Sequence, residues 1–227
     1  MNIKLVIDFL NNLRNNNNKI WFTEHKQEYL EIKNYISEIT EKLINEISKF
    51  DSSIQYLTIP ECTYRINRDL RFTKDKSPYK THIGIFISPH GKKSCHAGYY
   101  FHIEEDNSCF LASGAYSLEN KILNEIRNAI TAEPKKFISS LNKANDFVLF
   151  DTAKLKNVPN GFPINTNYSE YLKYKTYCLY KPLTKNIIYS KGLINYIVQS
   201  FEKTFEFNSF INEAIDFYIS EEKIKYI

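Results

Sequence analysis

Three of the five arginines of this chain lie within seven residues of one another, between Arg65 and Arg71. The chain of 227 residues otherwise relies on its 25 lysines for positive charge, so the planar, five-donor guanidinium group distinguishes this stretch. A guanidinium fork matches the geometry and the charge of phosphate and carboxylate groups. The stretch and the loop after it therefore predict a binding site for an anionic group. The predicted ligand-binding residues are Arg65, Arg68, Asp69, Arg71, Lys74, Lys76, Tyr79 and Lys80.

The arginine stretch is predicted to run as an extended strand into a basic loop. If residues 64–72 are extended, Arg65, Asp69 and Arg71 share one polar face. A buried Asp69 between two arginines would stay ionised and would leave guanidinium donors for a ligand. The fixed φ of Pro78 limits the freedom of the loop. From residue 65 to residue 82 there are six basic and two acidic side chains, a net charge of +4.

Two histidines and a tyrosine beside this stretch are the side chains best suited to move a proton. Apolar residues alternate with other residues in two short segments here, a period of two that is typical of β-strands. The alternation places His82, Tyr100 and His102 opposite the isoleucine face, together with Glu104. An imidazole changes its charge near neutral pH and can act as a general acid or base. His82, Tyr100 and His102 are the catalytic candidates, and the simpler interpretation is that they are partly exposed strand residues.

Three functional hypotheses follow from this pattern. In the first, the basic segment and the histidines form a cleft for an anionic small molecule, in a binding protein or in an enzyme. In the second, the basic loop is an interaction module for an acidic protein partner or nucleic acid, with tyrosines available to stack on bases. In the third, Arg65, Asp69 and Arg71 form a salt-bridge network that only holds the fold. The net charge of +4 is small for binding duplex nucleic acid by charge alone, which weakens the second.

The sequence contains none of the short motifs that identify common cofactor and catalytic sites. It lacks GxGxxG, GxxxxGK[ST], GxSxG and HExxH. His90, His96 and His102 have neither helical spacing nor a CxxC frame around them, so no metal site is predicted. No cofactor is predicted either, and the residues name neither a substrate nor a reaction.

Cysteine usage and hydropathy indicate the compartment. The four cysteines have no CxxC spacing and the N-terminus does not resemble a signal peptide, which favours a reduced, cytoplasmic compartment. No apolar run approaches the ~20 residues that a membrane-spanning helix needs. We therefore expect a cytoplasmic protein without a membrane partner.

The elements around these residues predict an α+β fold. Amphipathic helical patterns cover Leu5–Leu13 and run from about Thr23 to Phe50, and others return in the last third of the chain. An antiparallel meander is predicted near residues 62–114, and Ser117 is predicted to cap the helix after it. The expected architecture is a single domain over residues 1–227, in which an antiparallel β-sheet packs against helices from both the N- and C-terminal parts of the chain.

The segment RINRDLRFTKDKSPYKTH, from Arg65 to His82, closely resembles the signature of the DUF2461 family of uncharacterised proteins. The resemblance covers most of the chain and extends to Phe9-Leu10, Trp21-Phe22, His25, Gly98–Ile103 and Leu155–Phe162. The chain departs from the family pattern at Lys19 and Asn160, where the family tends to place arginine. Membership implies a stand-alone protein and no established activity. The resemblance therefore supports the importance of the arginine segment and leaves its chemistry open.

Overall fold

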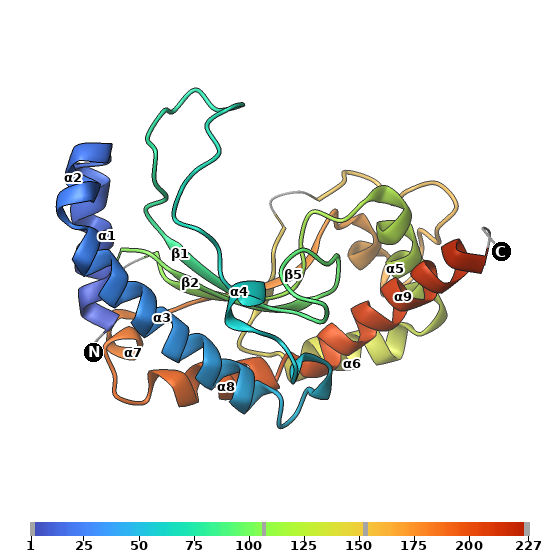
Figure 1. The fold of residues 1–227 in the computed structure, drawn as a ribbon. Helices are drawn as coiled ribbons and strands as arrows, with labels where there is room; N and C mark the ends of the chain where they lie inside the picture. The colour runs from blue at the N-terminus through green and yellow to red at the C-terminus, as the bar shows by residue number, and fades with distance from the viewer. Residues whose placement is uncertain (1–2, 106–107, 152–153, 225–227) are drawn as a thin grey trace.

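The computed structural model describes residues 3–105, 108–151 and 154–224, and within these ranges five antiparallel strands form a sheet in the order β1-β2-β3-β5-β4 (Figure 1). The strands are β1 (Ile83–Ile87), β2 (Gly98–Ile103), β3 (Phe110–Ala115), β4 (Val148–Leu149) and β5 (Tyr177–Pro182). The helices are α1 (Ile3–Asn15), α2 (Lys19–Glu24), α3 (Lys26–Ile47), α4 (Ile59–Cys62), α5 (Asn120–Ala132), α6 (Pro134–Lys143), α7 (Lys185–Ile188), α8 (Leu193–Glu202) and α9 (Phe205–Ile224), with 3-10 turns at Ser52–Ile54 and Ser169–Lys173. The predicted α+β class is confirmed.

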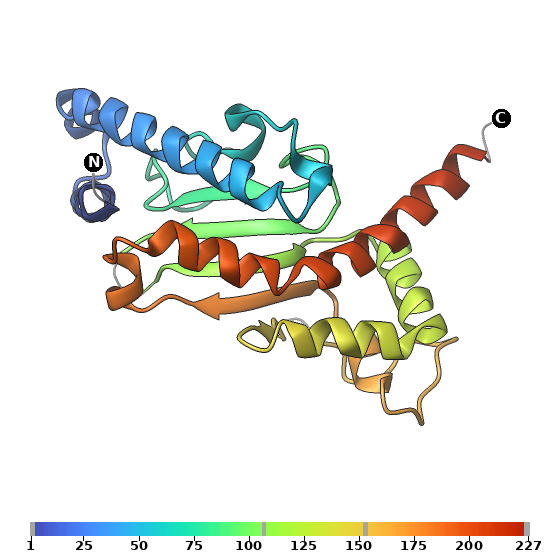
Figure 2. The ribbon, with the colours of Figure 1, turned by 90° about the horizontal axis from the view of Figure 1, so that it is seen from below.

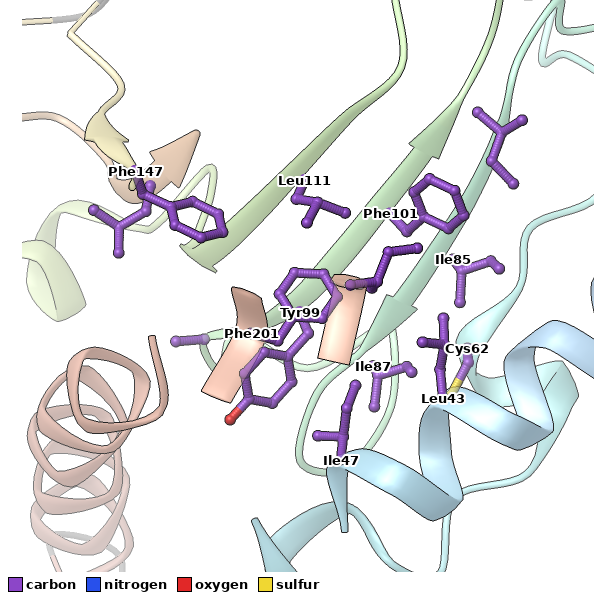
Figure 3. Close-up of a cluster of buried hydrophobic side chains, with 14 of the residues drawn as sticks. Leu43, Ile47, Cys62, Ile85, Ile87, Tyr99, Phe101, Leu111, Phe147 and Phe201 are labelled. Carbon is purple, nitrogen blue, oxygen red and sulfur yellow. The ribbon is translucent and has the colours of Figure 1, made fainter. Parts of the chain in front are cut away.

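One face of the sheet is apolar because side chains alternate along each strand. Ile85 pairs with Phe101 and Phe101 pairs with Leu111, so these three side chains share a face, and all three are buried. Figure 3 shows this face in contact with Leu43 of α3 and Phe201 of α8. Burying a side chain of this kind stabilises the fold by about 1.5–3 kcal/mol. The apolar face therefore holds the sheet against its helices.

Helices from both ends of the chain cover that face. Helix α3 and the pair α8 and α9 run across it in Figure 2. Ile32, Ile39 and Leu43 of α3 lie at helical spacing and are all buried, which confirms the predicted amphipathic stripe. The stretch predicted as one helix is divided at His25, where α2 ends and α3 begins. None of the described helices is long and apolar enough to span a bilayer.

The opposite face of the sheet carries aromatic side chains, glycines and His102. Gly84 pairs with His102, whereas Ala112 lies between Tyr100 on β2 and Tyr180 on β5. Helices α3, α6 and α8 lie below the sheet in Figure 1, and this face, termed the open face, points away from them. The open face is the part of the fold that positions the candidate site.

A loop of two limbs, residues 64–81, projects above the open face in Figure 1 and is termed the arm. The prediction of a strand over residues 64–72 is wrong, because the limbs pair with each other only through an isolated bridge between Asn67 and Tyr79. Ile66 is the one buried side chain between residues 64 and 78. The arm has little apolar surface to bury, so burial of apolar side chains does not hold it in the sheet.

Strands β4 and β5 complete the sheet, and the sequence pattern does not predict them. The apolar alternation of β5 is interrupted because Lys181 occupies a buried position on the apolar face. Its Nζ donates to Ser200 Oγ (3.0 Å) and to Asp146 Oδ2 (3.2 Å), so the buried ammonium group is paired.

The helix after the meander begins later than predicted. Ser117 has a φ of 57° and does not cap it. Glu119 is the N-cap residue of α5, which starts at Asn120. The left-handed backbone at Ser117 turns the chain before the helix can start.

Candidate functional site

A groove of about 1440 Å³ lies along the open face. Its lining extends from Arg65 and Lys80 on the arm, past Tyr100, to Phe150 and Tyr180 at the far side of the sheet. Typical small-molecule sites have volumes of roughly 300–1,000 Å³. The groove is therefore large enough for a ligand with two chemically different parts.

The base of the arm is fastened to the N-terminal helices. The side chain of Asn17 donates to Tyr79 O (2.9 Å) and accepts from Tyr79 N (3.1 Å). The Tyr79 ring stacks on Phe22 with 4.0 Å between ring centroids. The sequence suggests only a polar loop at the asparagine run, but Asn17 fixes the backbone next to Lys80, and Asn18 caps α2 through Trp21 N (3.0 Å).

Three cations line the arm side of the groove. The ammonium groups of Lys80 and Lys92 lie 5.4 and 5.6 Å from the ring centroid of Tyr64. Burial lowers the pKa of Lys80, and the charges of Arg65 and Lys92 lower it further. Arg65 and Lys80 form no ion pair with any described residue. The charges of the exposed Arg65 and the partly buried Lys92 therefore both act on the partly buried Lys80.

The carboxylate of Glu61, which interacts by charge with Lys92, is held by another residue. The carboxylate of Glu61 accepts from Thr58 N (2.8 Å) and Thr58 Oγ1 (2.6 Å), which is the main reason that its pKa lies below the usual range. Lys92 donates to Thr63 O (2.5 Å) and to the carbonyl of Pro60. Glu61 and Asp69 thus interact by charge with Lys92 and Arg65, but no carboxylate of the described residues forms an ion pair with Arg65, Lys80 or Lys92.

A chain of four polar side chains runs from the groove to α1. The hydroxyl of Tyr100 lies 2.9 Å from Nδ1 of His102, and Nε2 of His102 lies 3.1 Å from Oε2 of Glu104. The other carboxylate oxygen of Glu104 accepts from Arg14, which also pairs with Glu105 at 2.6 Å. The members from position 100 to position 104 are two residues apart on and just after β2, so they leave the strand on the same side.

The hydrogen bonds assign the proton positions in this chain. A carboxylate only accepts, so Nε2 of His102 carries the proton that it shares with Glu104. Nδ1 is then an acceptor, and Tyr100 donates to it. Burial lowers the pKa of His102 below its ordinary 6.5, an effect that Glu104 opposes. Burial also raises the pKa of Tyr100. Near neutral pH the imidazole of His102 is therefore neutral, and its Nδ1 accepts the hydrogen bond that Tyr100 donates.

His82 lies directly beside this chain. Its ring stacks on His102 with centroids 4.8 Å apart. Burial is the largest cause that lowers the pKa of His82, followed by repulsion from a charged His102. Glu104 opposes the shift and Lys80 adds to it. It is therefore unfavourable for His82 and His102 to be protonated at the same time.

Aromatic rings continue from the histidines across the open face. The Phe110 ring stacks on His102 with centroids 4.4 Å apart, and the Tyr180 ring lies 5.0 Å from Phe110. Phe150 lies 6.3 Å from Tyr180, and Tyr116 lies 6.3 Å from Phe150. The floor of the groove is therefore apolar and aromatic, in contrast to its cationic wall.

The structure brings some of the residues predicted from the sequence together and separates others. Arg65, Lys80, His82 and Tyr100 line the groove, and His102 lies against Tyr100. The other cations of the arm do not line the groove: Arg68, Arg71, Lys74 and Lys76 lie further along the arm with Asp69. Tyr79 is buried and holds the arm base.

The predicted buried carboxylate is wrong. Asp69 is exposed and pairs with the exposed Arg71 at 2.6 Å, and Arg68 pairs with Asp75 and donates to Ser77 O (3.2 Å). Arg65 takes no part in an ion pair with Asp69. Exposed ion pairs contribute about 0–1 kcal/mol, so these contacts shape the arm more than they stabilise the protein.

Sequence reasoning missed Lys92 and Arg14, the two distant members of the site. Lys92 follows Gly91 in a turn and has no pattern that links it to the arm. Arg14 lies 90 residues from Glu104 in the chain. Glu104 itself has a signal, since strand alternation places it on the side of Tyr100 and His102.

His90 and His96 lie away from the hydrogen-bonded chain that joins Tyr100, His102 and Glu104. The rings of His90 and His96 are 5.1 Å apart, and Nε2 of His96 lies 2.9 Å from Asp216 Oδ1. Across the described ranges, no three histidine, cysteine or carboxylate side chains are arranged as metal ligands would be. No two cysteines of the described residues form a disulfide with each other.

Comparison with known proteins gives one match. The model of a family described as "Conserved hypothetical protein (DUF2461)" matches residues 5–210. No curated protein and no solved structure matches the chain. The match covers the whole groove, including the arm, Arg14 and β5.

Proposed function

Because this chain belongs to the DUF2461 family of conserved hypothetical proteins, a description that names no reaction, we propose a function from the groove alone. The protein binds a small molecule through a negatively charged group, phosphate or carboxylate, and moves a proton to or from that molecule. Arg65, Lys80 and Lys92 hold the anionic group. Tyr100 and His102 transfer the proton, and His82 lies beside them.

The observation that carries this proposal is the concentration of positive charge without a paired carboxylate. Lys80 has a lowered pKa because it is partly buried and because Arg65 and Lys92 repel its charge. Such an arrangement costs free energy in the empty protein, and an anion that accepts hydrogen bonds from the same groups removes the cost. Hydrogen bonds between charged partners are also about twice as strong as neutral ones. The wall of the groove is therefore suited to an anion.

The proton step follows from the order of the hydrogen bonds. Tyr100 Oη accepts a proton from the ligand while its own proton passes to Nδ1 of His102. One proton thus moves from the ligand to the imidazole, and the phenol is restored. Glu104 stabilises the imidazolium that forms, and Arg14 holds Glu104 in place. His102 is the base in this step, and Tyr100 is the group that touches the ligand.

Binding of inorganic phosphate, measured by calorimetry, tests the anion site. Lys80→Gln should weaken it by at least about tenfold, since hydrogen bonds to charged groups contribute about 1.5–3 kcal/mol. Lys74→Gln is the matched control, because Lys74 is an exposed arm lysine outside the groove lining. Equal losses in both variants, or no binding by the wild type, would count against the site.

A second function is favoured by one observation on the arm. Phe72 is 94% exposed near the end of the arm, and the guanidinium carbon of Arg71 lies 5.6 Å from its ring centroid. Single-stranded nucleic acid is held by exposed aromatic rings among cations. In this proposal, Phe72→Leu weakens binding of a single-stranded oligonucleotide, and the affinity falls steeply with salt. Affinity that is insensitive to both changes would exclude the arm as the binding surface.

We also propose a cytoplasmic location for this protein. Its support is the absence of CxxC spacing in the sequence together with the absence of a disulfide between the cysteines of the described residues. Fractionation of cells that express the tagged chain measures it directly.

A further inference from the structure

The aromatic floor of the groove begins next to its cationic wall. His82 is two residues after Lys80, and its ring is the first of a series in which His102, Phe110 and Tyr180 follow at centroid distances of 4.8, 4.4 and 5.0 Å. A ligand anchored at Lys80 therefore has imidazole rings and then phenyl and phenol rings along the rest of its path. The anion site accounts for none of these aromatic side chains.

A gap in this floor lies above Ala112. Ala112 on β3 pairs with Tyr100 on one side and with Tyr180 on the other. The two tyrosines are two strands apart, so their backbones are roughly 10 Å from each other. The Phe110 ring lies 5.8 Å from that of Tyr100 and 5.0 Å from that of Tyr180, so this place has an aromatic ring along one side. The small side chain of Ala112 is buried and lines the groove together with Tyr100 and Tyr180.

Tyr100 does not fill the gap, because its ring leans toward β1. A β-carbon built on Gly84 would lie 2.6 Å from the Tyr100 hydroxyl oxygen and 2.7 Å from its Cε2. The phenol ring thus occupies the space above Gly84, on the side of Tyr100 away from Ala112. Phe110, two residues before Ala112 on β3, lies at one end of this place, and Gly114, two residues after Ala112, also lines the groove.

We propose that the ligand of this groove is a planar ring joined through a spacer to its anionic group, as in a nucleoside monophosphate. This inference rests on the proposed function, from which it takes the position of the anion. The ring lies over Ala112 between Tyr100 and Tyr180, and the phosphate or carboxylate lies at Arg65 and Lys80. The spacer is needed because His82 and His102 separate the two places. The ring places the spacer atoms beside Tyr100.

Four probes separate the parts of this proposal: adenosine 5′-monophosphate, ribose 5-phosphate, adenosine and inorganic phosphate. Calorimetry and saturation-transfer NMR measure their binding to the full chain. Adenosine monophosphate should bind about tenfold tighter than ribose 5-phosphate, because only the first has a ring to stack. Its purine protons should receive the strongest saturation transfer, since they lie among the rings.

Two variants test the position of the ring. Tyr180→Leu removes one stacking surface, and Ala112→Leu fills the gap without opening a cavity. Each should lower the affinity for adenosine monophosphate about tenfold and leave that for ribose 5-phosphate unchanged. Tyr56→Leu is the matched control, since Tyr56 is 88% exposed and lies outside the groove lining. Thermal unfolding of each variant identifies any that fails to fold, and the other variant then decides.

The outcomes distinguish this inference from the function on which it rests. If adenosine monophosphate and ribose 5-phosphate bind with equal affinity, and Lys80→Gln weakens both, the proposed place for the ring is overturned and the anion site is supported. Equal affinity for adenosine and adenosine monophosphate, both insensitive to Lys80→Gln, overturns the anion site and supports the ring. If none of the four probes binds, both are overturned.

Discussion

The phenol ring of Tyr100 lies where a side chain at Gly84 would stand, with its hydroxyl oxygen 2.6 Å from the ideal β-carbon position. Glycine on β1 therefore gives Tyr100 the room to reach His102. The hydroxyl of Tyr100 lies 2.9 Å from Nδ1 of His102, so this hydrogen bond depends on Gly84, which takes no part in it.

Gly84→Ala should destabilise the protein by about 1–3 kcal/mol, the usual cost of inserting atoms into a packed position. The cost should largely disappear when Tyr100→Leu is made in the same chain, because the clashing ring is then absent. Denaturant unfolding of the two single variants and the double variant measures this coupling. Additive effects of the two substitutions would mean that the ring does not occupy the space above Gly84.

Glu104→Gln should lower the pKa of His102. Glu104 is the group that raises this pKa against the effect of burial, both by its hydrogen bond to Nε2 and by its charge. NMR titration of the imidazole protons measures the shift. Glu105→Gln is the control, since Glu105 contacts Arg14 but not the imidazole. An unchanged pKa of His102 in the Glu104→Gln variant would contradict the hydrogen bond between His102 and Glu104.

Stability should fall as the pH is lowered below 6.5, and His82 should account for part of the fall. Its pKa in the folded protein is lower than its ordinary 6.5, because it is buried beside His102. Between these two values the unfolded chain binds the proton more readily, so protons favour unfolding. Unfolding experiments from pH 7 to pH 5 should show a smaller loss for His82→Gln. Identical slopes in the two proteins would show that burial does not shift this histidine.

Arg65→Gln should raise the pKa of Lys80. The charge of Arg65 is the second largest cause of the lowered value, after burial, and the substitution removes it without exposing Lys80. NMR titration of the Lys80 Cε protons measures the change. Arg71→Gln should leave it unaltered, since Arg71 is exposed and pairs with Asp69. If both substitutions changed the pKa of Lys80 equally, Arg65 would have no specific effect on Lys80.

Phe137→Ala should cost about 3–5 kcal/mol of stability, the usual range for removing a fully buried phenylalanine. Its ring is 0% exposed and lies 5.3 Å from the ring of Tyr171 and 5.4 Å from that of Phe210. Phe72→Ala, on the arm, should change stability by no more than about 0.5 kcal/mol. Chemical denaturation measures both. A large loss in the Phe72 variant would mean that the arm packs against the body of the protein.

The fold class and the face of β2 that carries Tyr100 and His102 were predictable from local patterns. Period-two alternation placed Tyr100, His102 and Glu104 on one side, and the structure brings all three into one hydrogen-bonded chain. Strand β5 was not predictable, because Lys181 interrupts its apolar positions and is tolerated only through Asp146 and Ser200. The single-domain organisation stays a prediction.

The arginine cluster shows what each level of information contributes. The sequence by itself determined that positive charge gathers between Arg65 and Lys80, because the residue types are enough to establish it. It could not determine which of these cations form ion pairs within the arm and which line the groove. Only the tertiary structure decided this: Arg68 and Arg71 are paired with carboxylates on the arm, while Arg65 and Lys80 meet Lys92 at the groove. The physical reason is that charge is a property of single residues, whereas its neutralisation depends on neighbours that distant parts of the chain supply.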